Sequence, residues 1–515
     1  MRIAEHGNPD LVASRANLRD IAALSRRRFL THTAALGLVS GASIPAAAQE
    51  SGDKAVPASA SEPPLAETLA RYALGLKYED LPDDVIRLAK RAIVDTIGCA
   101  FGGYTGQPSK IAMHLAKEVQ ARSQRGATVL ISGTRTTPDL ATFTNGVMFR
   151  YLDFNDSFVS YTRGAGHPSD TIAALLATAE IKGRTGRDLV AATVVAYETF
   201  AKVADVFDYL GNGIDHTTMT GLAAVVGAGR LMGLTQPQLV HAIGITVGGN
   251  TATRQGRADT LSNWKSYAAA DACRKAIFSV QLAAAGMTGP SEVFEGRYGF
   301  FKVMGRKAVS APQWGEPFGI RRVFTKRFPV GQFSQTVAQA ALEARPFFKT
   351  TDEIEEIVIH VSRSAIKIMA DGPDKWRPQT HETADHSIPY AAGVVLMHGT
   401  ISPEYYESRH LKDARLLDLV SRIKCIPSDE ADRMEREYNL CELELVLNSG
   451  ARKTTRVEYH RGHFKNPMPD EELNEKFRSM AMKHLSPERV EALLRLLWSI
   501  ERAPSVATLI AATRI

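Results

Sequence analysis

The sequence contains little cysteine and lacks the short motifs that mark metal, redox and acyl-transfer sites. Four cysteines among 515 residues are too few for a disulfide scaffold, and no CxxC pair is present for zinc binding or thiol exchange. There is no HExxH motif, no GxSxG elbow and no Gly-rich phosphate loop. These absences argue against a zinc enzyme, a Ser-His-Asp hydrolase and an iron–sulfur hydratase. Cys99 and Cys273 lie in Ala- and Gly-rich surroundings typical of helices, so we expect buried thiols there.

The chain also lacks a strong excess of charge of either sign. The net charge is +6, from 62 Lys and Arg against 56 Asp and Glu, and residues 1–48 carry six Arg against three acidic residues. The remainder is therefore close to neutral for its size, which gives no support for a nucleic-acid partner. Hydrophobic residues make up 44% of the chain and charged residues 23%, as in soluble globular proteins.

The N-terminus has the features of an export signal. Residues 25–30 read SRRRFL, a modestly apolar stretch follows, and Ala46–Ala48 offers a small-residue cleavage site. Paired arginines before a weakly apolar stretch resemble a twin-arginine signal, so we expect export by the twin-arginine machinery to the periplasm. The apolar stretch is too short for a stable membrane anchor. Residues 49–64 are rich in Ser, Pro, Ala and Glu and predict a disordered spacer.

From residue 65 to about residue 304 the apolar residues recur at helical spacing. The clearest segments are 83–101, 169–183, 186–204 and 217–234. Gly183, Gly233 and Gly286 follow such segments and predict helix ends. We therefore expect an all-helical domain that begins with residues 65–320.

The hydrophobic period changes after about residue 320. Residues 353–362 and 441–448 alternate in the manner of strands, and the turn at 448–450 leads into a second strand of a hairpin at 451–461. Helix-like stretches at 335–348 and 387–399 belong to the same region, which predicts a smaller α+β domain at 321–460. The tail, 461–515, returns to amphipathic helix from Asp470 and is expected to pack on the first domain. The fold class is thus mainly α, with an inserted α+β domain.

The densest group of polar residues lies at 145–158 and 164–170. If the first stretch is helical, Asp153 and Ser157 share one face at i and i+4. His167 precedes Pro168 at the expected start of a helix. Helix capping and surface charge are the alternative explanation for these residues.

Three further residues are candidates for chemistry. His216 precedes a long apolar helix, where the positive end of the helix dipole favours a neutral imidazole that accepts a proton. Lys265 and Lys326 would suit a substrate with several carboxylates if a cleft between the domains brought them together. Each of the three could equally be an ordinary cap or surface residue.

Several blocks of the sequence together resemble the MmgE/PrpD family, whose members include 2-methylcitrate dehydratases, cis-aconitate decarboxylases and an iminodisuccinate epimerase. The blocks are 81–103, 145–157 with the following HPS, 264–300, 326–329 and 375–390. The last long blocks look closer to the 2-methylcitrate dehydratase-like branch. The resemblance implies a helical domain with an inserted α+β lid, a homodimer, and no metal or organic cofactor. It also implies a pocket at the domain junction formed by Asp153, Ser157, His167, His216, Lys265, Lys326 and Tyr390.

Three features depart from the family pattern. Asn155 stands where many members have a second Asp, Arg150 stands where they have His, and VGQFSQ follows KRFP where relatives often place Glu and His. We expect a lyase that dehydrates a hydroxy-polycarboxylate such as 2-methylcitrate. Lys265 and Lys326 would hold carboxylates, His216 or Asp153 would take the α-proton, His167 would act as general acid, and Ser157 and Tyr390 would contact substrate. The alternatives are a decarboxylase or epimerase of a related di- or tricarboxylate, and a non-catalytic periplasmic carboxylate-binding protein.

Overall fold

The structure is a computed structural model that describes residues 63–119, 126–162, 164–258, 261–304, 312–435 and 437–515. The predicted export signal at 1–48 lies outside these residues, and so does the predicted spacer up to residue 62. Among the described residues, no helix combines the length and the apolar character needed to cross a lipid bilayer.

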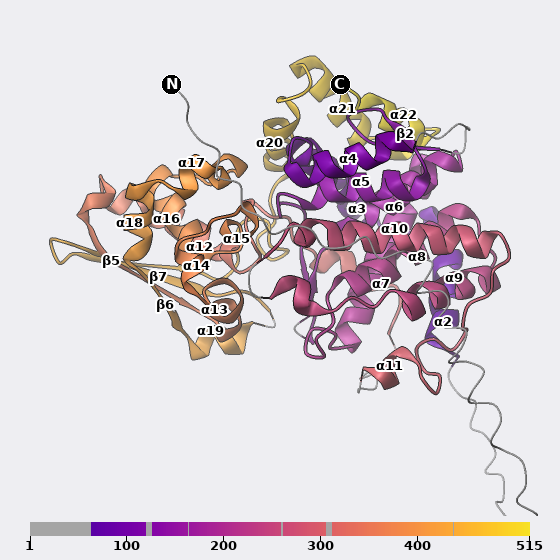
Figure 1. Cartoon of the computed structure of the whole chain (residues 1–515), viewed down its shortest axis with the longest axis horizontal. Helices are drawn as coiled ribbons and strands as arrows, with labels where there is room; N and C mark the ends of the chain where they lie inside the picture. The colour runs from indigo at the N-terminus through magenta and orange to yellow at the C-terminus, as the bar shows by residue number, and fades with distance from the viewer. Residues whose placement is uncertain (1–62, 120–125, 163, 259–260, 305–311, 436) are drawn as a thin grey trace, which may run out of the picture. The chain divides into compact units, whose positions relative to one another are not determined.

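The first part of the described chain is mainly helical, as the apolar spacing predicts. It is not all-helical, because two short antiparallel pairs lie between the helices: β1 (Ala127–Thr128) with β2 (Arg135–Thr136), and β3 (Phe158–Val159) with β4 (Ala165–Gly166). The helices are α2 (Leu65–Gly75), α3 (Asp83–Gly103), α4 (Gln107–Glu118), α5 (Pro138–Arg150), α6 (Ile172–Ile181), α7 (Gly186–Val206), α8 (Thr217–Met232), α9 (Gln236–Gly249), α10 (Trp264–Ala284) and α11 (Phe300–Val303). Helix α10 packs against both α5 and α8, and α6 packs against the same two helices (Figure 1). These helices bury a core rich in Ala, Val, Leu, Ile and Phe.

The ends of these helices follow the local sequence signals. Thr185 and Asp188 form a capping box that opens α7. Gly183, Gly233 and Gly286 have φ angles of 61°, 79° and 99°. Because residues with a Cβ atom are strained in this region, glycine is favoured there, and the three predicted helix ends are confirmed.

A four-stranded sheet forms in the C-terminal part of the chain, with the order β6-β5-β7-β8. The strands are β5 (Ile354–Val361), β6 (Ile423–Pro427), β7 (Cys441–Leu447) and β8 (Arg452–Val457). Strands β5 and β6 are parallel, and the other neighbours are antiparallel. The predicted strands β5 and β7 and the hairpin to β8 are confirmed. Strand β6 was not predicted, because a short, largely exposed edge strand has no clear alternation.

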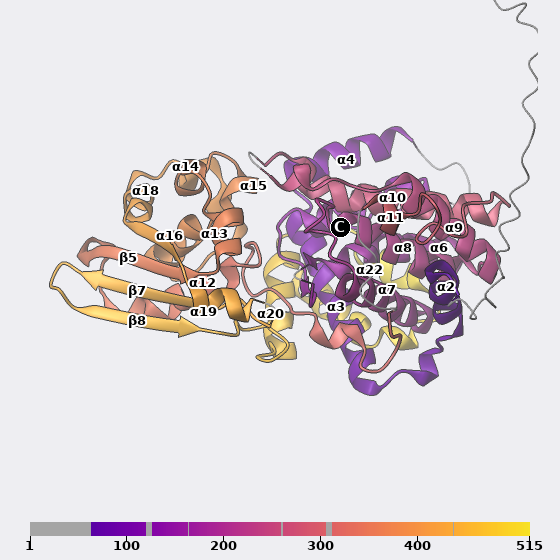
Figure 2. The same cartoon turned by 90° about the horizontal axis from the view of Figure 1, so that it is seen from below.

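Helices cover this sheet and build a second hydrophobic core. The helices of this region are α12 (Ser334–Ala344), α13 (Arg363–Met369), α14 (Pro373–Trp376), α15 (His381–Ala384), α16 (Ile388–His398), α17 (Ser408–Leu411), α18 (Ala414–Ser421) and α19 (Asp429–Met434). Figure 2 shows α16 and α18 on one side of the sheet. The alternating residues of β7, from Cys441 to Leu447, are buried in this second core together with α12 and α16.

The C-terminal tail is helical and contacts the first helices of the chain. Its helices are α20 (Asp470–Ala481), α21 (Pro487–Trp498) and α22 (Val506–Ala512). Lys476 of α20 forms a buried ion pair of 2.6 Å with Asp95 of α3. Asp470, the first residue of α20, accepts hydrogen bonds from Arg87 and Arg91 of α3. Helix α20 of the tail therefore packs on α3, and the domain boundaries and the lid remain predictions. Cys99 and Cys273 are buried free thiols, as expected.

Candidate functional site

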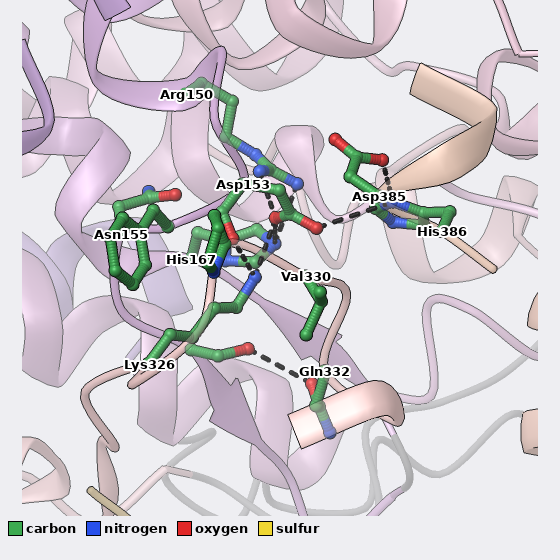
Figure 3. Close-up of polar contacts among 12 residues, drawn as sticks. Arg150, Asp153, Asn155, His167, Lys326, Val330, Gln332, Asp385 and His386 are labelled. Carbon is green, nitrogen blue, oxygen red and sulfur yellow. Dashed lines mark hydrogen bonds and ion pairs between the residues drawn. The ribbon is translucent and has the colours of Figure 1, made fainter. Parts of the chain in front are cut away.

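Five charged side chains from distant parts of the sequence meet in one buried group, which we call the charge cluster. They are Arg150, Asp153, Lys265, Lys326 and Asp385. Each is at most 2% exposed. Figure 3 shows the Asp153 carboxylate between Arg150, Lys326 and His386. The five residues lie in α5 and the turn after it, in α10, in the segment before α12 and in the segment between α15 and α16.

Asp153 is the centre of one half of the cluster. Its Oδ1 atom pairs with the guanidinium of Arg150 and accepts a hydrogen bond from Lys326 Nζ at 2.7 Å. Lys326 Nζ also donates to the main-chain carbonyl of Asp153 at 2.8 Å. Two cations from different segments thus share one carboxylate, which fixes both side chains.

The expectation that Asp153 and Ser157 share a helical face is wrong. Helix α5 ends at Arg150, and Asp153 has a φ angle of 48°, in the left-handed region that Asp tolerates better than most residues. Ser157 instead exchanges two backbone hydrogen bonds of 2.9 Å with Phe324. This bridge brings the chain just before Lys326 beside the Asp153 turn. Buried ion pairing and the bridge therefore override the local helical spacing.

Lys265 and Asp385 form the other half of the cluster. Lys265 lies in the first turn of α10, and its Nζ atom contacts both carboxylate oxygens of Asp385 at 2.6 Å. Asp385 also accepts a hydrogen bond of 2.8 Å from Nδ1 of His386. The pair joins the helical part of the chain to the region that contains the sheet.

The charges in the cluster do not balance. Three cations face two carboxylates, which leaves one net positive charge in this set of five residues. Burial opposes ionisation of Asp153, but Arg150 and Lys326 hold the pKa of its carboxyl well below the usual range. Burial lowers the pKa of Lys326 to about 8, although Asp153 opposes that shift. The cluster is therefore suited to a carboxylate ligand, and Asp153 is a weak base.

His167 is held in one tautomer by two hydrogen bonds. Its Nε2 atom lies 3.0 Å from Nη2 of Arg150, and its Nδ1 atom lies 2.6 Å from the carbonyl oxygen of Asp156. A guanidinium only donates and a carbonyl only accepts, so the ring proton is on Nδ1 and Nε2 accepts. Burial and the nearby Arg150 cation also lower the pKa of His167 well below its ordinary value. This geometry favours a positioning role over the general acid role expected from the sequence.

His216 precedes the first residue of α8, as expected, and its ring packs edge-on against His167 with centroids 5.3 Å apart. Its Nδ1 atom lies 3.6 Å from Oδ1 of Asp215, and Asp215 is held by Arg257 at 3.1 Å. Burial lowers the pKa of His216 to about 3, so the imidazole is neutral near pH 7. Its Nε2 atom is buried without a hydrogen-bond partner. The neutral form expected from the sequence is therefore present, with burial as its main cause.

The two residues expected to contact substrate differ in position. Ser157 Oγ donates to Oε1 of Gln332 at 3.1 Å, and Figure 3 shows Gln332 at the edge of the cluster. Tyr390 lies in the second hydrophobic core, and its hydroxyl donates to the carbonyl of Tyr405 at 2.6 Å. The structure thus brings Asp153, His167, Lys265 and Lys326 into shared contacts, with His216 beside His167. Tyr390 lies apart from these residues, with its hydroxyl hydrogen-bonded to Tyr405 in the second hydrophobic core.

Sequence reasoning missed three residues of the site. Arg150 was noted only as a departure from the family pattern, and Asp385 and His386 were not singled out. The available signal was the acid–histidine pair in HETADHS, directly before the apolar helix α16. Without the partner Lys265, which is distant in sequence, that pair has the pattern of an ordinary helix start.

Two further buried carboxyl groups, those of Asp156 and Asp170, lie near the cluster. Asp170 accepts a hydrogen bond from Asn155 at 2.9 Å, but its other oxygen has no partner. Burial raises the pKa of Asp170 to about 7. Burial also raises the pKa of Asp156 to about 6, against hydrogen bonds from Ser169 and Tyr197.

We predict that Asp170→Asn stabilises the protein at pH 8. A folded-state pKa above the unfolded value means that the unfolded chain loses this proton first, so Asp170 costs stability increasingly from pH 4 to pH 7. The amide removes that cost and should raise the free energy of unfolding by about 1–3 kcal/mol at pH 8, and by less at pH 5. Denaturant unfolding at both pH values measures the difference, with exposed Asp374→Asn as control. A gain at pH 5 equal to that at pH 8 would contradict the assignment.

Asp153, Asp385 and His386 place ligand-type atoms within 4.8 Å of one another, a spacing that could hold a metal ion. Their partners make the site unsuitable for one. Lys326 and Lys265 donate to the two carboxylates at 2.6–2.7 Å, and Arg150 pairs with the first. A divalent cation would have to displace ammonium groups and lie beside the remaining positive charge. The donor set therefore fits an anion and not a metal ion.

The fold and the cluster together define a mainly helical protein with a small mixed sheet and a buried site suited to an anion. Residues 67–312 match the family model described as MmgE/PrpD N-terminal domain, and residues 328–501 match the one described as MmgE/PrpD C-terminal domain. The chain belongs to the MmgE/PrpD family. The family resemblance of the sequence is thereby confirmed.

Several curated relatives cover most of the chain. A cis-aconitate decarboxylase of Homo sapiens is 27% identical over 464 residues, which are 85% of this chain and 92% of that protein. A 2-methylcitrate dehydratase of Cupriavidus necator is 25% identical over 472 residues, 84% of this chain and 91% of that protein. A 2-methylcitrate dehydratase of Escherichia coli (strain K12) is 26% identical over 422 residues, 75% and 84% of the two chains. The relatives bear the names of two different enzymes, which supports enzymatic activity without selecting one reaction.

Proposed function

We propose that the protein is a lyase that removes water from a hydroxy-polycarboxylate of the 2-methylcitrate type. The observation that supports this most is the charge cluster, in which two ammonium groups and a guanidinium outnumber the carboxylates beside neutral imidazoles. In a buried site such cations bind substrate carboxylates strongly. They also stabilise the negative charge that builds up when the adjacent carbon loses its proton.

The cations have distinct tasks in this proposal. Lys265 and Lys326 hold substrate carboxylates, and Arg150 adds a third positive charge beside them. Asp153 is less suited to the α-proton because Arg150 and Lys326 keep it ionised and weakly basic. His216 stays a candidate for proton transfer, with His167 holding the adjacent Arg150. Ser157 and Tyr390 remain candidates for substrate contact.

Decarboxylation of a related tricarboxylate is the second candidate, because the human relative at 27% identity is named a cis-aconitate decarboxylase. Epimerisation of a dicarboxylate would need the same cations. All three reactions pass through a carbanion-like state next to a carboxylate, so they share the features of the cluster. Their products differ: an alkene and water, carbon dioxide, or an inverted stereocentre.

Three expectations about the whole protein stay proposals. We propose export to the periplasm by the twin-arginine route, an α+β lid at 321–460 inserted into a helical domain of 65–320 and 461–515, and a homodimer. Cell fractionation with Arg26 and Arg27 both replaced by Lys tests the first. Retention of the variant in the cytoplasm is the expected result, and unchanged export would exclude that route.

Turnover assays on the purified chain test the proposed reaction. We expect 2-methylcitrate or a close hydroxy-tricarboxylate to raise the melting temperature and to yield an alkene without release of carbon dioxide. Carbon dioxide release from cis-aconitate would favour the decarboxylase, and racemisation alone would favour the epimerase. Binding of polycarboxylates without turnover of any would identify a non-catalytic carboxylate-binding protein and overturn the proposal.

A further inference from the structure

His386 is the most accessible of the four imidazoles around the charge cluster. Its side chain is 19% exposed, against 13% for His381, 10% for His167 and 9% for His216. The Nε2 atom of His167 is occupied by Arg150, and the Nε2 atoms of His216 and His381 are closed to solvent. His386 is therefore best placed to meet a small molecule at the cluster.

Hydrogen bonding leaves one nitrogen of His386 free to accept a proton. The Nδ1 atom lies 2.8 Å from Oδ1 of Asp385 and 3.4 Å from Oδ2 of Asp153. Both carboxylates are ionised and only accept, so Nδ1 bears the ring proton and the lone pair is on Nε2. Lys265 fixes Asp385 through both of its oxygens, and this fixes the imidazole in turn. The arrangement is an acid–histidine pair of the kind that orients a general base.

The main chain at Gly331 lies beside the Nε2 edge of the His386 ring. The Gly331 amide donates to the carbonyl of Asp385 at 2.7 Å, which fixes residue 331 beside the pair. A Cβ atom at this position would lie 3.4 Å from Nε2 of His386 and 2.6 Å from Cε of Met369. A side chain at residue 331 would therefore crowd Met369 and contact Nε2 of His386.

We infer that His386 is a catalytic residue that takes the α-proton of the substrate on Nε2, with Asp385 as its positioning residue. The inference rests on the proposed lyase function. The carbon–hydrogen bond breaks as the Nε2–H bond forms, and its electron pair stays on the α-carbon as a carbanion that the cations of the cluster stabilise. This pair forms the carbon–carbon double bond as the carbon–oxygen bond to the neighbouring carbon breaks, and the leaving hydroxyl takes the proton from Nε2 and departs as water, which restores neutral His386.

The electrostatics of the cluster suit this cycle. Burial lowers the pKa of His386 to about 4, with Lys265 acting in the same direction and Asp153 and Asp385 against it. The ring is therefore neutral near pH 7 before substrate binds. A polycarboxylate adds negative charge beside the ring, which raises its pKa and favours transient protonation. The two carboxylates at Nδ1 then stabilise the imidazolium.

The experiment compares His386→Asn with the wild type on the hydroxy-tricarboxylate that the wild type dehydrates. The Asn amide reproduces the Nδ1–H donor to Asp385 but offers no basic nitrogen at the position of Nε2. We expect kcat to fall at least a hundredfold, KM to stay within about threefold, and exchange of the α-hydrogen in deuterium oxide to be lost. In His386→Ala, added imidazole should restore part of the exchange. His398→Asn, at the far end of α16, should behave as the wild type.

The possible results distinguish a failure of this inference from a failure of the proposed lyase function. If the wild type turns over substrate and His386→Asn keeps kcat within threefold, His386 is not the base and the lyase function stands. Loss of exchange in His216→Asn with exchange retained in His386→Asn would assign the base to His216 instead. A wild type that dehydrates no hydroxy-polycarboxylate would overturn both proposals.

Discussion

Replacing Lys265 with methionine is expected to lower kcat/KM by about 10²–10³-fold, the usual effect of removing one donor that stabilises developing negative charge. Lys265 is 2% exposed and its Nζ atom contacts both oxygens of Asp385 at 2.6 Å. Methionine keeps most of the length of the side chain and removes the charge. The variant therefore loses the positive charge that would bind a substrate carboxylate, and it also loses the two hydrogen bonds that fix Asp385.

Lys275→Met is the matched control for this variant. Lys275 lies on the same helix and pairs with Asp271 at 2.9 Å, but its side chain is 40% exposed. Its loss should leave kcat/KM within about twofold, since exposed pairs contribute little. The double variant Lys265→Met/Asp385→Asn removes both buried charges, so it should be more stable than Lys265→Met and equally inactive. Full activity in Lys265→Met with a folded chain would contradict the role of the ammonium.

Asp153→Asn is expected to lower the free energy of unfolding by about 3–5 kcal/mol, because it leaves two buried cations without their carboxylate. Arg150 and Lys326 both pair with Asp153, and none of the three is more than 2% exposed. Asparagine tolerates the left-handed backbone at this position, so the substitution tests the charge and not the turn. Denaturant unfolding followed by circular dichroism measures the loss.

The same experiment at low pH tests how the stabilisation by Asp153 depends on its charge. The folded-state pKa of Asp153 is depressed, so its stabilising contribution is present above the ordinary carboxyl pKa of about 4 and is lost as pH falls below it. The deficit of Asp153→Asn seen at pH 6 should therefore shrink as the pH falls below about 4. Asp205→Asn, which removes a partly exposed partner of Arg322, should cost only about 1 kcal/mol or less. Equal losses in the two variants would show that Asp153 is not a buried counter-ion.

Helix identity was predictable from sequence because it depends on local spacing. The apolar residues of α3, α7 and α8 repeat at helical intervals, and glycine marks several ends. Strands β5 and β7 alternate clearly, whereas β6 gains its place only by pairing with β5. An edge strand of this kind depends on a tertiary partner, which local pattern does not contain.

The charge cluster was predictable only in part, for the same reason. Lys265 and Lys326 were singled out as cations that a cleft could bring together, and they lie in one cluster with Asp153. The turn at Asp153 was not predictable, because it depends on Arg150, Lys326 and the bridge to Phe324. Asp385 gains significance only through Lys265, which lies 120 residues away in the sequence.

Isothermal titration of propane-1,2,3-tricarboxylate, which has no hydroxyl group to lose, tests directly whether the charge cluster is a polycarboxylate site. The wild type should bind one molecule per chain, and Lys265→Met should bind it at least tenfold more weakly, while Lys275→Met binds it as the wild type does. The corresponding triamide, which has the same shape without charge, should not bind. Binding of the triamide with equal affinity, or unchanged tricarboxylate affinity in Lys265→Met, would contradict the account.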